Sequence, residues 1–144
     1  IRYARISGAT YCIQSNSAVD DINNNHLSGC RYGVYTNSGS PRITNNLIAE
    51  NSEAGIYVGN SNPTIKYNTL DLNGDYGVYI HSGYDNSNQV LENNIITRNN
   101  VGLYNGDDTT RGYNNIWGNG TDYSSIAAAE TDISSDPQYL DPYA

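Results

Sequence analysis

Three pentads decide the fold of this chain: YGVYT at residues 32–36, AGIYV at 54–58 and YGVYI at 76–80. Each has a glycine in second place, followed by an aliphatic residue and a tyrosine. The three glycines lie 22 residues apart, and a fourth copy, VGLYN at 101–105, follows after 25. A fixed period of this length is typical of stacked repeats, in which each unit buries its apolar face against its neighbours. The sequence therefore predicts a solenoid.

A second phrase, built around an asparagine, recurs out of phase with the pentads. An aliphatic residue stands three positions before the asparagine and another two positions after it, as in ITNNLI at 43–48. We expect the asparagines to adopt left-handed backbone geometry at a tight turn and to stack into a ladder through their side-chain amides. Ala4 fills the same position one period earlier. The predicted ladder contains Asn25, Asn46, Asn68, Asn94 and Asn115.

The aliphatic residues of these phrases predict the core. Within each unit, short segments of alternating aliphatic and polar residues are separated by Gly, Asn, Ser and Asp, which is typical of strands joined by turns. No segment has helical apolar spacing over three turns. We expect Trp117 to end one interior column, and we expect another column to be formed by Ile22, Ile43, Ile65 and Leu91. The prediction is an all-β parallel solenoid.

The stretch GIYVGNSNPTIKYNTLDLN at 55–73 resembles the right-handed parallel β-helix repeat of pectate-lyase-like proteins, which include carbohydrate-binding proteins and sugar hydrolases. The resemblance covers nearly the whole chain. It implies a right-handed, single-stranded parallel β-helix of about six coils with a 21–22-residue period. We expect the coils to occupy residues 1–120, and residues 121–144 to form an irregular tail that packs on the last coils. Because this fold hosts lyases, hydrolases, epimerases, adhesins and surface rods, the resemblance fixes no activity.

The pentads also predict a row of outward-facing tyrosines. If Ile56 points into the core, its neighbours Gly55 and Tyr57 point outward. Tyrosine rings beside a bare glycine strip suit sugars, which offer both C–H faces and hydroxyls; the alternative is that tyrosine simply stacks well between neighbouring strands. The candidate substrate-binding residues are Tyr35, Tyr57, Tyr79, Tyr104, Gly55 and Gly77.

Two acids lie on the same predicted face, Glu53 and Asp75, each two positions before a pentad glycine. Neighbouring coils would place their carboxylates about 5 Å apart, a separation that suits retaining glycosidases and calcium ligands. Arg31, one coil earlier, offers Glu53 an ordinary ion pair instead. No cofactor is expected other than Ca²⁺, for which these two acids offer a site, and no catalytic residue is assigned beyond these two candidates.

The composition of the chain argues against two classes of binding partner. The 144 residues carry a net charge of −8 and one lysine, Lys66, which argues against nucleic acid and against anionic membranes. No apolar run reaches transmembrane length, so membrane insertion is not expected. The chain begins at Ile1 rather than Met, and we expect it to be part of a longer secreted protein at the cell surface or outside the cell. A polysaccharide or other glycan is the expected partner.

The two cysteines are expected to be free thiols. Cys30 lies one coil after Cys12 but three residues short of the register position at Gly33. That offset adds roughly 10 Å along the chain, which exceeds the Cα–Cα limit of about 7 Å for a disulfide.

Two functional hypotheses follow. The first is a non-catalytic extracellular module, a surface, scaffold or filament subunit that contacts glycans through its tyrosines. The second is part of a polysaccharide lyase, hydrolase or epimerase that uses Glu53 and Asp75, which longer loops or a facing basic residue would favour. Because IRYARI at 1–6 reads directly as a strand without a cap, we also expect the first coil to meet an upstream domain or another copy of the chain.

Overall fold

The computed structural model describes residues 1–17, 19–81, 88–105 and 109–140, which contain seventeen strands and no helix. The strands form three parallel sheets. Sheet B contains β1 (Arg5–Ser7), β4 (His26–Ser28), β7 (Leu47–Ala49), β10 (Thr69–Asp71), β13 (Ile95–Thr97) and β16 (Asn115–Trp117). Sheet C contains β2 (Tyr11–Ser15), β5 (Tyr32–Thr36), β8 (Ala54–Val58), β11 (Tyr76–Ile80), β14 (Val101–Asn105) and β17 (Thr121–Ser124). Sheet A contains β3 (Asp21–Asn23), β6 (Arg42–Thr44), β9 (Thr64–Lys66), β12 (Val90–Glu92) and β15 (Thr110–Gly112).

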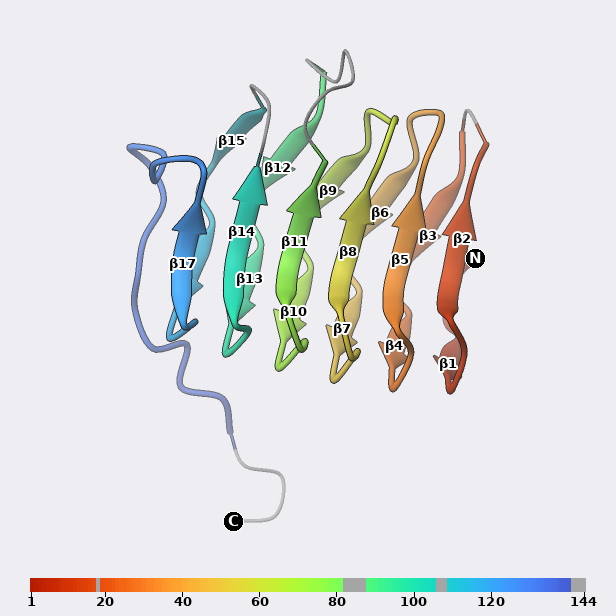
Figure 1. The fold of residues 1–144 in the computed structure, drawn as a ribbon, viewed down its shortest axis with the longest axis horizontal. Coiled ribbons are helices and arrows are strands. Elements are labelled where there is room, and N and C mark those ends of the chain that lie inside the picture. Colours follow the sequence, from red (N-terminus) through yellow and green to blue (C-terminus); the bar gives the residue numbers. More distant parts are fainter. Residues whose placement is uncertain (18, 82–87, 106–108, 141–144) are drawn as a thin grey trace.

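Each turn of the chain adds one strand to each sheet, and every strand pairs in parallel with its equivalent one coil away. Figure 1 shows the coils side by side, from the first coil (red) to the last (blue). With five strands in sheet A, the solenoid makes about five full turns. The predicted all-β parallel solenoid is confirmed. Strand β17 pairs in parallel with β14, so residues 121–124, which were expected to lie in the irregular tail, form part of sheet C.

The core lies between the three sheets and is built from aliphatic columns. The predicted column from Ile22 to Leu91 is in register and almost completely buried, which removes its side chains from water. The expectation that Trp117 ends a column is wrong, because Ile96 pairs with Ile116 and Trp117 pairs with Thr97. The last repeat is one residue shorter than the phrase suggested, and a one-residue shift moves a side chain to the other face of a strand.

The asparagine ladder is present, with a correction at its end. The Oδ1 atom of Asn46 accepts the backbone N–H and the side-chain amide of Asn25, both at 3.0 Å. Ala4 donates its backbone N–H to Asn25, as expected for a ladder position without an amide. Asn94 is followed by Asn114, which accepts both of its donors at 3.0 Å, and not by the predicted Asn115. In each step the amide oxygen points toward the preceding coil.

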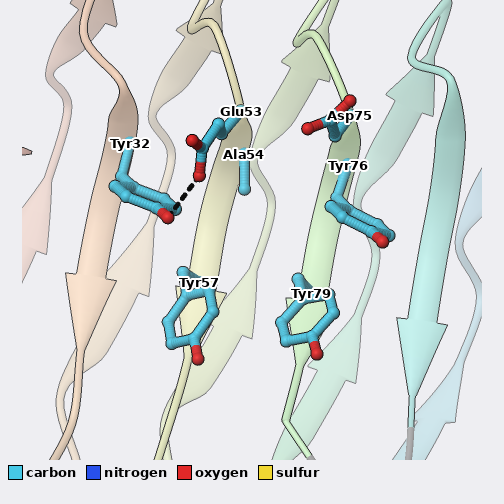
Figure 2. Close-up of a pocket in the computed structure, with 7 residues that line it drawn as sticks. All are labelled: Tyr32, Glu53, Ala54, Tyr57, Asp75, Tyr76 and Tyr79. Carbon is cyan, nitrogen blue, oxygen red and sulfur yellow. Dashed lines mark hydrogen bonds between the residues drawn. The ribbon is translucent and has the colours of Figure 1, made fainter.

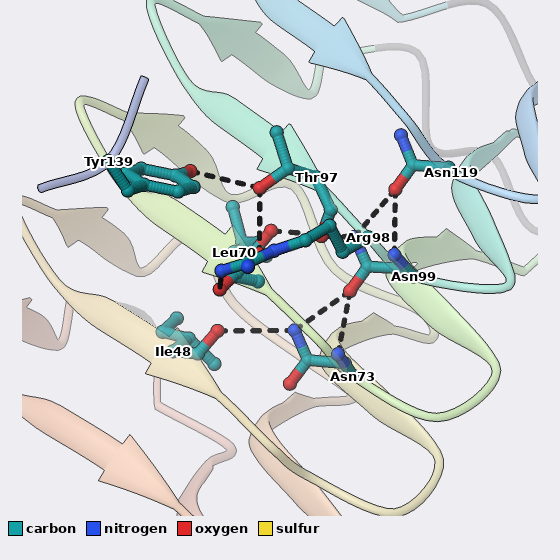
Figure 3. A network of polar contacts seen from close by, with 9 residues as sticks. Ile48, Leu70, Asn73, Thr97, Arg98, Asn99, Asn119 and Tyr139 are labelled. Carbon is teal, nitrogen blue, oxygen red and sulfur yellow. Dashed lines mark hydrogen bonds and ion pairs between the residues drawn. The ribbon is translucent and has the colours of Figure 1, made fainter. Parts of the chain in front are cut away.

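A second ladder, which was not predicted, runs parallel to the first. Asn99 accepts the backbone N–H and side-chain amide of Asn73 at 2.8 and 3.1 Å, and Asn99 donates in turn to Asn119 (Figure 3). Its members are Asn51, Asn73, Asn99 and Asn119. Each lies five residues after a member of the first ladder. Since most of these asparagines are buried, the ladders satisfy polar groups that water cannot reach.

The residue before each ladder position makes the turn. The expectation that the asparagines themselves have left-handed backbones is wrong, because the described residues with positive φ include no member of either ladder. Before the first ladder φ is 54–58° at Tyr3, Asn24, Asn45, Tyr67, Asn93 and Tyr113. Before the second ladder φ is 53–75° at Gly8, Gly29, Glu50, Leu72, Arg98 and Gly118. Both corners of sheet B therefore use one left-handed residue per coil.

The prediction of free thiols is wrong, because Cys12 and Cys30 form a disulfide with a Cα–Cα distance of 5.7 Å. The offset of roughly 10 Å holds only for an extended chain. The chain instead turns a corner at Gly29, which places Cys30 beside the strand of the preceding coil. The first two coils are therefore covalently joined.

Aspartates close both ladders at the last coil. Asp132 accepts the backbone N–H and side-chain amide of Asn114 at 2.8 and 3.0 Å, and Asp122 accepts the same two groups of Asn119 at 3.2 and 2.9 Å. A carboxylate accepts hydrogen bonds but has no amide hydrogen to pass on. The tail then runs back over sheet B, where the Tyr139 hydroxyl lies 2.9 Å from Thr97 Oγ1 (Figure 3).

Candidate functional site

The outer face of sheet C carries two columns of side chains. The first and fourth residues of each pentad lie on the outer face, while the second and third, and the fifth of the pentads at 32–36, 54–58 and 76–80, point inward; Ala54, at a first position, is only 1% exposed. Tyr35, Tyr57, Tyr79 and Tyr104 form the first column, which we call the tyrosine ladder, with parallel rings 4.8–5.1 Å apart. The predicted aromatic ladder is confirmed as an arrangement of side chains. Its rings are half-buried, so part of each remains accessible.

The expectation that a strip of glycines lies on this face is wrong. Gly55 and Gly77 are buried, and a Cβ built on either would lie 2.9 Å from the side-chain amide of Asn73 or Asn99. Both glycines therefore face the core and leave room for the second ladder. The expectation that side chains alternate strictly between the inner and outer faces is wrong here, because two successive residues of the pentad, Gly55 and Ile56, point inward.

A second outward column comes from the first residue of each pentad. It contains Tyr11, Tyr32, Ala54, Tyr76 and Val101. Tyr32 meets Tyr57 edge to face at 5.6 Å, and Tyr76 meets Tyr79 in the same way at 4.8 Å. This column was not predicted, because a simple alternation of inward and outward residues does not give the pentad two successive inward positions. The signal was present in the repeated tyrosine at the first position.

Ala54 interrupts that column and opens a pocket, which we call the Ala54 notch. Tyr32 and Tyr76 stand on either side of Ala54, and Tyr57 and Tyr79 lie below it (Figure 2). Glu53 and Asp75 complete the lining, and the volume is about 230 Å³. The structure thus brings together both candidate acids and two of the four candidate tyrosines; Tyr35 and Tyr104 lie further along the ladder.

Glu53 is fully engaged. One carboxylate oxygen accepts a hydrogen bond from Arg31 Nε at 2.5 Å, and the other accepts one from the Tyr32 hydroxyl (Figure 2). The ion pair foreseen with Arg31 is confirmed. The hydrogen bond from Tyr32, followed by that from Arg31, lowers the pKa of Glu53, so this group is a fixed anion at neutral pH. Burial, aided by the Glu53 carboxylate, raises the pKa of Tyr32 to about 12, so its hydroxyl remains a donor.

Asp75 differs from Glu53. Its side chain is exposed, and no hydrogen bond or ion pair joins its carboxylate to another side chain in the described part of the chain. Its backbone N–H donates to the Glu53 carbonyl at 2.7 Å, which fixes it one coil further along the same edge. The notch therefore has one neutralised acid and one exposed acid on its rim.

Neither a cluster of metal ligands nor a membrane-spanning helix is found in the part of the chain that the structure describes. Across residues 1–17, 19–81, 88–105 and 109–140, no group of three or more His, Cys, Asp and Glu side chains is placed to hold a metal ion. Within the same ranges, no helix has the length and apolar character needed to cross a membrane. The Ca²⁺ site at Glu53 and Asp75 stays a prediction.

Comparison with known proteins gives one match. The model of a family described as "Right handed beta helix region" matches residues 1–132. No curated protein and no solved structure is significantly similar to the chain. The match spans the repeats and specifies no activity.

Proposed function

The chain belongs to the right-handed β-helix family, and on that premise we propose that it is a non-catalytic extracellular module that contacts glycans through its tyrosine ladder. The family match supports the predicted handedness of the coil and the predicted resemblance to the β-helix repeat. The partner and the location go beyond the family: the outer face of sheet C supports the proposed partner, and the disulfide supports the proposed location.

The observation that carries this proposal is the regular spacing of the ladder. Four parallel tyrosines repeat at 4.8–5.1 Å along the axis of the rod. A linear glycan presents its own units at regular intervals, each with a C–H face and hydroxyls. Tyrosine matches both features, because its ring is apolar and its hydroxyl donates and accepts hydrogen bonds. A row of such rings suits a ligand that is long and repetitive.

The disulfide supports an extracellular location. Disulfides form and persist in oxidising compartments and are rare in the reducing cytosol. Cys12 and Cys30 bond in a coil that already has the hydrogen-bond ladder, so their pairing adds a cross-link suited to such a compartment.

The proposal includes a role as a scaffold or filament subunit, in which the edge of β1 and β2 meets an upstream domain of the same protein or another copy of the chain. Strands β1 and β2 lie at the ends of their sheets, and Tyr3 in the same coil is 82% exposed. Exposed strand edges recruit further strands. Light scattering over a wide concentration range tests this part, since a monodisperse monomer throughout would contradict self-association.

The glycan proposal is tested by binding of the intact chain to a polysaccharide array. We expect Tyr57→Ala with Tyr79→Ala to reduce binding at least tenfold, because the double variant removes two adjacent rings at roughly 1 kcal/mol or more each. The control is Tyr113→Ala, which removes an exposed tyrosine at a corner away from sheet C. Equal binding by the double variant and the control, or no binding by the parent chain, would return the ladder to a structural role.

The same array distinguishes the enzymatic alternative. If Glu53 and Asp75 act in catalysis, the parent chain will shorten a bound polysaccharide, and Asp75→Asn will not. Release of oligosaccharides by the parent chain would therefore favour a lyase or hydrolase over a binding module.

A further inference from the structure

The Ala54 notch differs from the rest of the outer face in shape. In the column Tyr11, Tyr32, Ala54, Tyr76, the only small residue lies between two tyrosines. The rings of Tyr57 and Tyr79 turn toward the viewer below the gap, and Tyr32 and Tyr76 are seen edge-on above it (Figure 2). The pocket of about 230 Å³ is thus bounded by four aromatic rings. It can hold one group of a ligand that lies along the tyrosine ladder.

The charge of the notch is negative. Glu53 and Asp75 both line it, and its lining among the described residues includes no lysine or arginine. The Glu53 charge is balanced by Arg31, which approaches from the preceding coil. At the equivalent position one coil before Asp75 lies Glu53, which is also an acid. At the equivalent position one coil before Glu53 lies the base Arg31. The rim therefore retains one negative charge that the neighbouring column does not balance.

The chain itself shows how such a face holds a cation. The guanidinium carbon of Arg31 lies 5.2 Å from the centre of the Tyr32 ring, while its Nε donates to Glu53 at 2.5 Å. A cation is thus held between an aromatic ring and a carboxylate on the border of the notch. The notch presents the same two kinds of group, tyrosine rings and the Asp75 carboxylate, around an open space.

We propose that the Ala54 notch binds the protonated amino group of an amino sugar in a glycan chain that lies along the tyrosine ladder. The inference rests on the proposed function and specifies its ligand. The ammonium group gains a cation–π contact with the tyrosines and a charge-assisted hydrogen bond to Asp75. A uronic acid unit carries the opposite charge and is repelled by Glu53 and Asp75, so polyuronates are excluded.

The experiment compares hexasaccharides that share one β-1,4-linked backbone and differ at carbon 2: glucosamine, N-acetylglucosamine and glucose. Binding to the intact chain is measured by titration calorimetry at low salt and about pH 5.5, where carboxylates are ionised and the sugar amine is protonated. We expect the glucosamine oligomer to bind about tenfold more tightly than the other two, from one cation–π contact and one partly exposed ion pair. A galacturonic acid hexamer should bind most weakly.

Two variants and a control test whether the preference for the glucosamine oligomer arises at the Ala54 notch. Asp75→Asn keeps the shape and removes the charge, and Ala54→Tyr fills the notch with the residue that Tyr32 and Tyr76 place on either side. Both should reduce the preference for the amine to about one, while Tyr57-dependent binding of the glucose oligomer remains. Glu92→Gln removes one acid from sheet A, where it pairs with Lys66, and should leave the preference unchanged. Far-ultraviolet circular dichroism and thermal unfolding confirm the fold of each variant.

The results distinguish failure of the amino-sugar site from failure of the proposed glycan-binding function. If the chain binds the glucose oligomer through Tyr57 without preferring the amine, or if Asp75→Asn keeps the preference, the amino-sugar site is wrong and the proposed function stands. If the chain binds none of the oligomers on the array or in solution, both are wrong. Because Asp75→Asn changes a single exposed side chain, this test holds even if Ala54→Tyr does not fold.

Discussion

Cys12 and Cys30 occupy, in the first two coils, the positions that a glycine and an asparagine occupy in the coils that follow. Cys12 lies opposite Gly33 in sheet C, and the backbone N–H of Cys30 donates to Asn51 as a ladder residue would. One coil later, a Cβ built on Gly33 would lie 3.0 Å from the side-chain amide of Asn51. The disulfide therefore replaces a glycine–asparagine contact with a covalent bond.

This relationship predicts how the disulfide can be replaced. Removing it with alanine at both positions should cost about 3 kcal/mol of unfolding free energy, because it closes a short loop with a sequence separation of 18. The pair Cys12→Gly and Cys30→Asn should recover about 1 kcal/mol, since the new asparagine can donate to Asn51. Urea denaturation of the three proteins checks the order, which would be contradicted by equal midpoints for the two variants.

The ladders should be sensitive to the loss of one member. Asn68 is buried, and its Oδ1 accepts two hydrogen bonds from Asn46 while its amide donates to Asn94. Asn68→Ala leaves buried donors and an acceptor unpaired, so it should cost about 3 kcal/mol. The exposed Asn60 provides the matched control, for which Asn60→Ala should change unfolding by less than about 0.5 kcal/mol. Comparable losses for the two variants in urea denaturation would contradict a structural role of the ladder.

The strained corners predict a stabilising change. Tyr67 has a φ of 58° and is 58% exposed, so it adopts a left-handed backbone at a cost of roughly 1–2 kcal/mol and gains little from burial. Asparagine tolerates this geometry and holds the equivalent place as Asn45 and Asn93. Tyr67→Asn should therefore raise the free energy of unfolding by about 0.5–1 kcal/mol. Tyr67→Ala keeps a Cβ without the local hydrogen bonding and should bring no such gain in a thermal melt.

We expect Glu53 to make the free energy of unfolding depend on pH in the acidic range. Its pKa is lower in the folded chain than its ordinary value of 4.5, because Tyr32 and Arg31 donate hydrogen bonds to the carboxylate. This contribution is present above pH 4.5 and is lost as the pH falls through the pKa of the folded state. We expect the midpoint of urea unfolding to fall less between neutral and acidic pH for Glu53→Gln than for the parent chain. Identical pH profiles would show that the two hydrogen bonds add nothing to stability.

The period of the sequence was enough to predict the solenoid, its register and its core. Aliphatic residues at a fixed spacing have one low-energy arrangement, in which each stacks on its equivalent. The exceptions came where one residue was lost: Asn114 and Ile116 replace the predicted Asn115 and Trp117 because the last repeat is shorter. When a repeat loses one residue, its phrase is still recognisable in the sequence. The loss nevertheless changes which residue pairs with the preceding coil and which side chain faces the core.

The candidate site was predicted in part. The tyrosine ladder and the Arg31–Glu53 pair followed from position alone, because residues one coil apart must be neighbours. The Ala54 notch did not, since it depends on a pentad in which Gly55 and Ile56 both face the core. The second ladder and the disulfide depend on corners that bring residues five apart along the chain into equivalent positions. These corners depend on single φ angles that the sequence pattern does not specify.

The direction of the two asparagine ladders gives the rod an electrical polarity. Each side-chain amide is a small dipole with its oxygen toward the preceding coil, and the dipoles of a ladder add as they do along a helix. The positive end lies at the last coil, where Asp122 and Asp132 meet it with negative charge. The negative end lies at the first coil, where the backbone N–H of Ala4 donates to Asn25 Oδ1 and the charge of Arg2 is paired with Asp21. The two described ladders therefore have ends of opposite electrostatic sign, and the last coil places two carboxylates at the positive one.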